Sequence, residues 1–258
     1  MTPAALDALL ASIGPRWQLD IRAHSQQVKE AYEPLLAAAP RGDITITRDL
    51  AYGPHPRQVL DVFKPARVEA LAPVVAFVHG GAFVRGDKRA TTQIYDNVAL
   101  WFARQGCIGL NVEYRLAPEV VYPAGGEDVT RAVHWLREHA AEFGGDPWRL
   151  FLIGHSAGGT HAAAAAFDPA VTAGRRLPIA ALVLISARLR ADRLDENPNA
   201  DGVAAYFGAD ASLDDSRSPL AHVATSDVPV MVAVAQYENP LLDVYGLEFA
   251  QRLGAVRR

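Results

Sequence analysis

Short apolar runs alternate with longer segments of helical periodicity along most of the chain. Residues 74–78 and 108–112 are continuously apolar, as expected for strands that are buried on both faces of a parallel sheet. Farther on, Val129, Val133, Leu136 and Ala140 recur at the spacing of one helix face. This alternation predicts an α/β fold, with a mostly parallel, doubly wound sheet that carries helices on both faces.

Seven strands are predicted in one domain that spans residues 1–258. They cover residues 44–47, 58–63, 74–78, 108–112, 150–153, 180–185 and 230–235. Residues 1–40 read as an N-terminal helical cap segment, broken near Gly14-Pro15. Residues 187–227 are polar and loop-rich, and they interrupt the alternation between the sixth and seventh strands. We expect this cap-like insertion to help the N-terminal helices cover a pocket; a plain surface insertion is the alternative.

Composition narrows the range of partners and compartments. The chain is 50% hydrophobic with a net charge of -4 and no basic cluster, so nucleic acid is not an expected partner. No apolar run approaches the ~20 residues needed to span a bilayer, so no membrane partner is expected. Cys107 is the single cysteine, and residues 1–13 lack the pattern of a signal peptide, which together favour a cytoplasmic location. No metal-ligand spacing appears, and no cofactor is expected.

One pentapeptide, Gly154-His155-Ser156-Ala157-Gly158, lies between a predicted strand and a predicted helix, where the chain must make a tight turn. The G-x-S-x-G pattern is typical of a nucleophile elbow, in which a serine sits on a strained corner with its hydroxyl exposed. The glycines leave room at such a turn because they carry no Cβ. The pattern therefore predicts Ser156 as a nucleophile, with an ordinary structural turn as the alternative.

A second motif, His79-Gly80-Gly81-Ala82-Phe83, directly follows the third predicted strand. A glycine loop in this place can turn backbone N–H groups toward the elbow, where they would stabilise an oxyanion. The backbone N–H of Ala157, just after the serine, would supply another donor. The alternative for this loop is a simple glycine turn.

With these motifs the chain resembles the hormone-sensitive-lipase-like carboxylesterases. Two further motifs carry the resemblance, Tyr114-Arg115-Leu116-Ala117-Pro118-Glu119 and Gly144-Gly145-Asp146-Pro147, and it runs from about residue 40 to the end. It implies an α/β-hydrolase fold, Ser156 as nucleophile, and an oxyanion hole formed by Gly80, Gly81 and Ala157. It also implies that His79 shapes the loop without transferring protons. The chain departs from the family at Ala82, where many members have a third glycine.

The resemblance places the acid of the catalytic triad after the seventh strand. Many members have an aspartate before a Pro-Leu pair, but Asn239 stands there in this chain. Counting from the start of the strand at Pro229 puts Glu238 on the acid position instead. Asp243 is the reserve, and a solvated loop carboxylate is the alternative for Glu238.

The catalytic base is the missing part of the pattern. Triad order in this fold is serine, acid, histidine, yet no histidine follows Glu238. His134 and His139 are expected to be solvated and His161 to be packed, and His222, in the loop before the seventh strand, is not expected to act as a surrogate base. The eight histidines are His24, His55, His79, His134, His139, His155, His161 and His222.

Two explanations for the absent histidine stay open. The chain could be a truncated form of a longer esterase, without an eighth strand and the histidine loop, or a natural shorter protein that has lost ordinary triad chemistry. The abrupt end favours truncation. An absent eighth strand would expose the edge of the seventh, which predicts a homodimer formed through that sheet edge.

The motifs together predict a serine hydrolase that cleaves carboxylic esters of small to medium size through an acyl-enzyme. The expected partner is a small-molecule ester. One alternative is an arylformamidase-type amidase of the same fold. Another is a catalytically impaired binding protein, because the triad histidine is absent.

Overall fold

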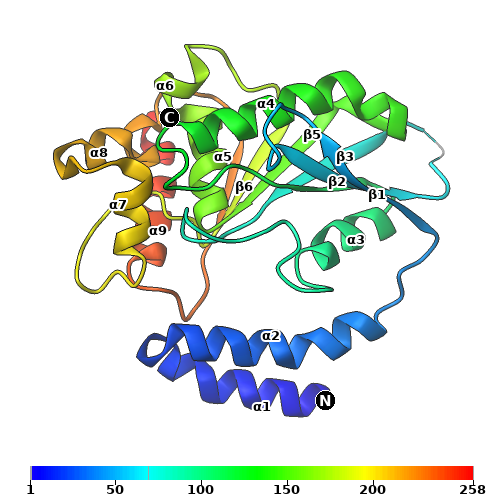
Figure 1. Ribbon diagram of the computed structural model, residues 1–258, viewed down its shortest axis with the longest axis horizontal. Coiled ribbons are helices and arrows are strands. Elements are labelled where there is room, and N and C mark those ends of the chain that lie inside the picture. Colours follow the sequence, from blue (N-terminus) through cyan, green and yellow to red (C-terminus); the bar gives the residue numbers. More distant parts are fainter. Residues whose placement is uncertain (1, 69, 258) are drawn as a thin grey trace.

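A single twisted sheet organises the protein (Figure 1). The structure is a computed structural model that describes residues 2–68 and 70–257. In these residues seven strands pair in the order β1-β2-β4-β3-β5-β6-β7. The neighbours from β4 through β7 run parallel, while β2 is antiparallel to both β1 and β4. The strands are β1 Ile44–Ala51, β2 Val59–Pro65, β3 Ala72–Val78, β4 Ile108–Val112, β5 Gly145–His155, β6 Ala181–Ile185 and β7 Val230–Ala233.

The seven predicted strands are confirmed, with shifted ends in several of them and the largest change in β5. β5 begins at Gly145, five residues before the apolar run that predicted it. It begins early because Gly145 still pairs with Ala72 of β3, where a register irregularity separates this pair from the regular ladder. Polar residues in this part of β5 therefore belong to the strand although they carry no apolar signal.

Helices cover both faces of the sheet, as predicted. They are α1 Pro3–Ile13, α2 Ile21–Ala38, α3 Asp96–Arg104, α4 Ala124–His139, α5 Ala157–Phe167, α6 Pro169–Thr172, α7 Ala200–Phe207, α8 Asp214–Arg217 and α9 Leu242–Val256. Short 3-10 turns lie at Gly14–Leu19, Ala140–Phe143, Ala211–Leu213 and Pro219–His222. The first of these turns confirms the break that Gly14-Pro15 predicts between α1 and α2. No helix within the described residues is both long and apolar enough to cross a bilayer.

Alternating side chains of β3 divide the core into two layers. Val74, Ala76 and Val78 pack into the main cluster, which also holds apolar residues of α4, α5 and α9. Val75 and Phe77 point to the opposite face and pack against α3. This period of two is the geometry of a strand buried on both sides, and it explains why the β3 run contains no polar residue.

The segment 187–227 differs from the prediction. The polar composition predicts loops, but the segment contains α7 and α8 as well as two 3-10 turns. Val203, Tyr206 and Phe207 of α7 are 2% exposed or less. A helix this short is not stable by its own propensity, so packing against the rest of the protein accounts for it.

The N-terminal helices reach the body of the protein at the loop after β7. Trp17 Nε1 donates to Asn239 Oδ1 at 3.0 Å, and Gln18 Nε2 donates to the Glu238 carbonyl at 3.0 Å. In Figure 1 α1 and α2 lie below the sheet, apart from α7 and α8. That the N-terminal helices and residues 187–227 jointly cover a pocket stays a prediction.

Candidate active site

Ser156 occupies the turn between β5 and α5 in a strained backbone conformation. Its φ is 53° and its ψ is -121°, a region that costs a non-glycine residue about 1–3 kcal/mol. The Ser156 N–H donates to the Ile185 carbonyl of β6 at 3.0 Å, and the Ser156 carbonyl accepts from the Gly159 N–H at 3.0 Å. These contacts hold the turn, and Ser156 itself is partly exposed. The geometry is that of the elbow predicted from the pentapeptide.

The two glycines of the elbow are required by close backbone approaches. A Cβ on Gly154 would lie 2.6 Å from the Gly159 Cα, and a Cβ on Gly158 would lie 2.3 Å from the His79 carbonyl oxygen. Both distances are shorter than any real Cβ contact. The start of α5 therefore lies against the end of β3, where the glycine loop begins.

The glycine loop and the elbow are in direct contact. A Cβ on Gly80 would lie 3.0 Å from the Ser156 Cβ and 2.9 Å from His155 Nδ1. Gly81 has a φ of 155°, and a Cβ there would overlap the Arg85 carbonyl oxygen. Ala157 is the buried first residue of α5, where backbone N–H groups have no partner within the helix and favour negative charge. Gly80, Gly81 and Ala157 are thus brought together around Ser156.

His79 is fixed at the base of this loop. Its ring is buried, with Nε2 at 3.0 Å from Glu113 Oε1 and Nδ1 at 2.8 Å from the Gly80 carbonyl oxygen. The Tyr114 hydroxyl donates to the His79 carbonyl at 2.8 Å. Because both ring nitrogens already face acceptor oxygens, this arrangement anchors the loop and leaves no ring nitrogen free to accept a proton from Ser156.

Glu238 lies at the same edge of the sheet as the elbow. Its Oε1 accepts from the Ser186 hydroxyl at 2.5 Å and from the Ala235 N–H at 2.8 Å, and the residue is 9% exposed. Ser186 directly follows β6, whose last residue, Ile185, accepts from the Ser156 N–H. A row of contacts therefore joins the ends of β5, β6 and β7.

Asp243 lies outside this row. It belongs to the first turn of α9 and is partly exposed, and its side chain makes no hydrogen bond or ion pair with other described residues. Of the two candidate acids, Glu238 is the one connected to the elbow. Its catalytic role stays a prediction.

All eight histidines lie among the described residues, and none is hydrogen-bonded to Ser156 Oγ. His222 has its Nε2 2.9 Å from the Ser216 carbonyl oxygen and 3.7 Å from Asp168 Oδ1. Asp168 caps the C-terminal end of α5, about 18 Å from Ser156 by helical rise. His222 therefore lies too far from Ser156 to act as a surrogate base.

The packed histidine of α5 is His161, as predicted. It is 1% exposed, its Nδ1 has no hydrogen-bond partner within the described residues, and burial lowers its pKa to about 3. His155 has its Nδ1 3.4 Å from the Tyr95 hydroxyl, and burial together with the nearby His79 lowers its pKa to about 4. His134 is exposed as expected, whereas His139 is partly buried and stacks on Trp135.

Two neighbours of the site were missed by the sequence analysis. Ser186 had a usable signal, because it follows a strand at the carboxyl edge of a parallel sheet, where binding residues gather. Tyr95 had none. Its φ is 80°, its ring lies 6.2 Å from that of His79, and burial raises the pKa of its phenol against the opposing effect of the Gly80 N–H.

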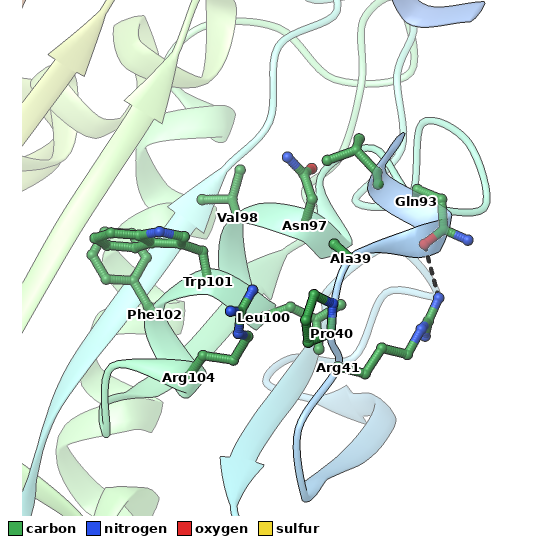
Figure 2. Close-up of a pocket in the computed structure, with 11 residues that line it drawn as sticks. Ala39, Pro40, Arg41, Gln93, Asn97, Val98, Leu100, Trp101, Phe102 and Arg104 are labelled. Carbon is green, nitrogen blue, oxygen red and sulfur yellow. Dashed lines mark hydrogen bonds between the residues drawn. The ribbon is translucent and has the colours of Figure 1, made fainter. Parts of the chain in front are cut away.

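A surface groove of about 360 Å³ lies elsewhere, between the end of α2 and the outer face of α3 (Figure 2). Its apolar lining includes Leu36, Val98 and Trp101, and Arg41 Nη2 donates to Gln93 Oε1 at its rim at 2.8 Å. None of the predicted site residues lines this groove. Within the described residues, no three or more His, Cys, Asp or Glu side chains form a cluster that could hold a metal ion.

Comparisons with known proteins agree with this geometry. A family model described as BD-FAE matches residues 60–176. Esterase LipI from Mycobacterium tuberculosis is 43% identical over 100 residues, which cover 37% of this chain and 29% of that protein. An isoprenylcysteine alpha-carbonyl methylesterase from Arabidopsis thaliana is 32% identical over 125 residues, which cover 48% of this chain and 28% of that protein. The matched segments thus span less than a third of each of these curated relatives.

Solved structures extend the likeness to nearly the whole chain. Esterase B from Lactobacillus Rhamnosis has a TM-score of 0.73 at 23% identity, with 98% of this chain and 82% of that chain covered. A hyperthermophilic esterase from the archaeon Pyrobaculum calidifontis has a TM-score of 0.70 at 22% identity, with 99% and 86% covered. At these identities the structures establish the α/β-hydrolase fold. The motifs at Ser156 and Gly80 and the curated relatives make the chain similar, within that fold, to the hormone-sensitive-lipase-like carboxylesterases.

Proposed function

We propose that this protein is a serine hydrolase that cleaves carboxylic esters of small to medium size through an acyl-enzyme. The observation that carries the proposal is the contact between the strained Ser156 elbow and the glycine loop at Gly80. A nucleophile and backbone donors side by side are what acyl transfer requires. The esterase names of the curated relatives support the same reaction class.

In the proposed reaction, Ser156 Oγ attacks the ester carbonyl carbon, its proton passes through solvent water to the leaving oxygen, and the bond from the carbonyl carbon to that oxygen breaks so that the alcohol leaves. Water then hydrolyses the acyl-serine. The backbone N–H groups of Gly80, Gly81 and Ala157 would hold the oxyanion of each tetrahedral intermediate. The Glu238 carboxylate lies at the same sheet edge, where it would stabilise a water molecule that takes up the serine proton and becomes positively charged.

The direct test is reaction with a fluorophosphonate probe, which reports the nucleophile without requiring turnover. We expect the folded protein to be labelled on the peptide that contains Ser156, and to release p-nitrophenol from short-chain esters. Folded protein that stays unlabelled would contradict the proposal and favour the impaired binding protein. Faster turnover of a formyl amide than of an aryl ester would favour the amidase.

Replacing each of the two candidate acids, Glu238 and Asp243, by its amide tests which one is the acid of the triad. Glu238→Gln keeps an acceptor oxygen for the Ser186 hydroxyl and the Ala235 N–H but removes the charge. We expect it to lower the ester hydrolysis rate by about tenfold or more, and Asp243→Asn to leave the rate within about twofold. Rate constants measured with both variants at equal thermal stability check this. A larger loss in Asp243→Asn would reverse the assignment.

The β7 edge supports a proposed homodimer, since β7 is hydrogen-bonded to β6 alone among the described strands. Met231 on this edge is 61% exposed. Unpaired strand groups beside exposed apolar side chains favour pairing with a second copy. A cytoplasmic location remains a prediction from the single-cysteine composition.

A further inference from the structure

Helix α7 packs directly against the glycine loop. A Cβ on Gly202 of α7 would lie 2.3 Å from the Ala82 carbonyl oxygen, so only glycine lets the helix approach this closely. The peptide that it touches is strained, because Ala82 has a φ of 51° and Phe83 a φ of 71°. Left-handed conformations at two consecutive non-glycine residues persist only where the surroundings hold them.

Aromatic stacking fixes the next residue of the loop. The rings of Phe83 and Tyr206 lie 5.0 Å apart with an interplanar angle of 5°, and Phe207 meets Phe83 edge-on at 5.6 Å. Tyr206 is itself held at both ends. Its hydroxyl accepts from the Gly125 N–H at 3.2 Å, and its carbonyl accepts from the Tyr122 N–H at 2.7 Å.

The same apolar cluster also touches the elbow. Its buried members are Phe83, Ala117, Ala157, Ala191, Val203, Tyr206 and Phe207. The two segments predicted to donate to the oxyanion, the glycine loop and the start of α5, thus pack into one cluster that α7 closes. A shift of α7 would therefore move the loop relative to Ser156.

We propose that Gly202 and Tyr206 are positioning residues, through which α7 holds the Ala82–Phe83 peptide so that the loop amides face the Ser156 elbow. The proposal rests on the proposed hydrolase function. It assigns a role in catalysis to a helix of the segment 187–227, where composition predicted loops. The role is indirect, because α7 acts on the reacting atoms only through the glycine loop.

Gly202→Val and Ala204→Val form a matched pair, because both place a valine on α7, but Gly202 lies against the Ala82 carbonyl whereas Ala204 lies outside the cluster. We expect Gly202→Val to lower the second-order rate of phosphonate labelling by about 10- to 100-fold, since misplaced oxyanion donors slow acyl transfer. Its kcat for a short ester should fall while KM stays within about threefold. Ala204→Val should stay within about twofold of the wild type in each quantity.

A second pair of variants, at Tyr206, separates a loss of positioning from a general folding defect. Tyr206→Phe keeps the stack on Phe83 and should keep labelling within about threefold, whereas Tyr206→Leu removes it and should resemble Gly202→Val. Hydrogen exchange of the 79–84 peptide adds a readout that needs no activity, and it should speed up in Gly202→Val and Tyr206→Leu only. Unchanged exchange and wild-type labelling in Gly202→Val would overturn the positioning role. If the wild type is not labelled but Gly202→Val still speeds up exchange of the 79–84 peptide, the hydrolase proposal is wrong. In that case the structural coupling between α7 and the glycine loop stands.

Discussion

Ser156→Ala is expected to abolish phosphonate labelling and to lower ester hydrolysis on the order of 10³-fold or to the rate in buffer. The reason is chemical: without Oγ no acyl-enzyme can form, and the remaining backbone donors can only polarise a bound ester. The fold should be unaffected, since the Ser156 N–H and carbonyl make the hydrogen bonds that hold the turn. Labelling, hydrolysis rate and thermal unfolding of the variant are the measurements.

A matched control is Ser216→Ala, at an exposed serine of α8 whose hydroxyl donates to the Leu213 carbonyl. It should keep both labelling and hydrolysis at the wild-type level. Hydrolysis that survives in Ser156→Ala at more than about a tenth of the wild-type rate would show that another group carries the reaction. Labelled Ser156→Ala would place the nucleophile elsewhere in the chain.

The local parts of the site could be predicted because each depends on a short stretch of sequence. A sharp strand–helix turn needs Gly154 and Gly158 within five residues, so the pattern in the sequence directly reports the close approaches in the structure. The buried strands were readable for the same reason, since a strand covered on both faces leaves an uninterrupted apolar run. The position of Glu238 is what the family resemblance implies, and its role as the acid stays a prediction.

The parts that failed depend on contacts between distant segments. α7 has eight residues with a glycine among them, and its helical state comes from packing on Phe83 and Tyr122, which lie about 80 or more residues away in the chain. The early start of β5 reflects pairing with Ala72, which no property of residues 145–149 announces. The place of His222 beside Asp168, at the far end of α5, likewise depends on the fold and has no local pattern that reports it.

Acidification is expected to destabilise the protein through His161. Its folded pKa of about 3 lies below the 6.5 of an exposed histidine, because burial disfavours the charged ring. The unfolded chain therefore binds the proton more readily, so stability is complete above about pH 6.5 and declines as the pH falls toward 3. Each pH unit in this window costs about 1.4 kcal/mol, or about 2 kcal/mol between pH 6.5 and pH 5. Denaturant unfolding at several pH values measures the slope.

His155 adds to this slope with the same sign, and its partial exposure makes its share the smaller one. His161→Leu isolates the larger share, because leucine fits among the rings of Phe83, Tyr114 and Tyr206 and leaves nothing to protonate. The variant should lose most of the slope between pH 6.5 and pH 5, whatever its stability at pH 7. An unchanged slope would mean that His161 stays neutral through this range in the unfolded chain as well, or that it is protonated in the fold. Either result would remove burial of the neutral ring as the cause of acid sensitivity.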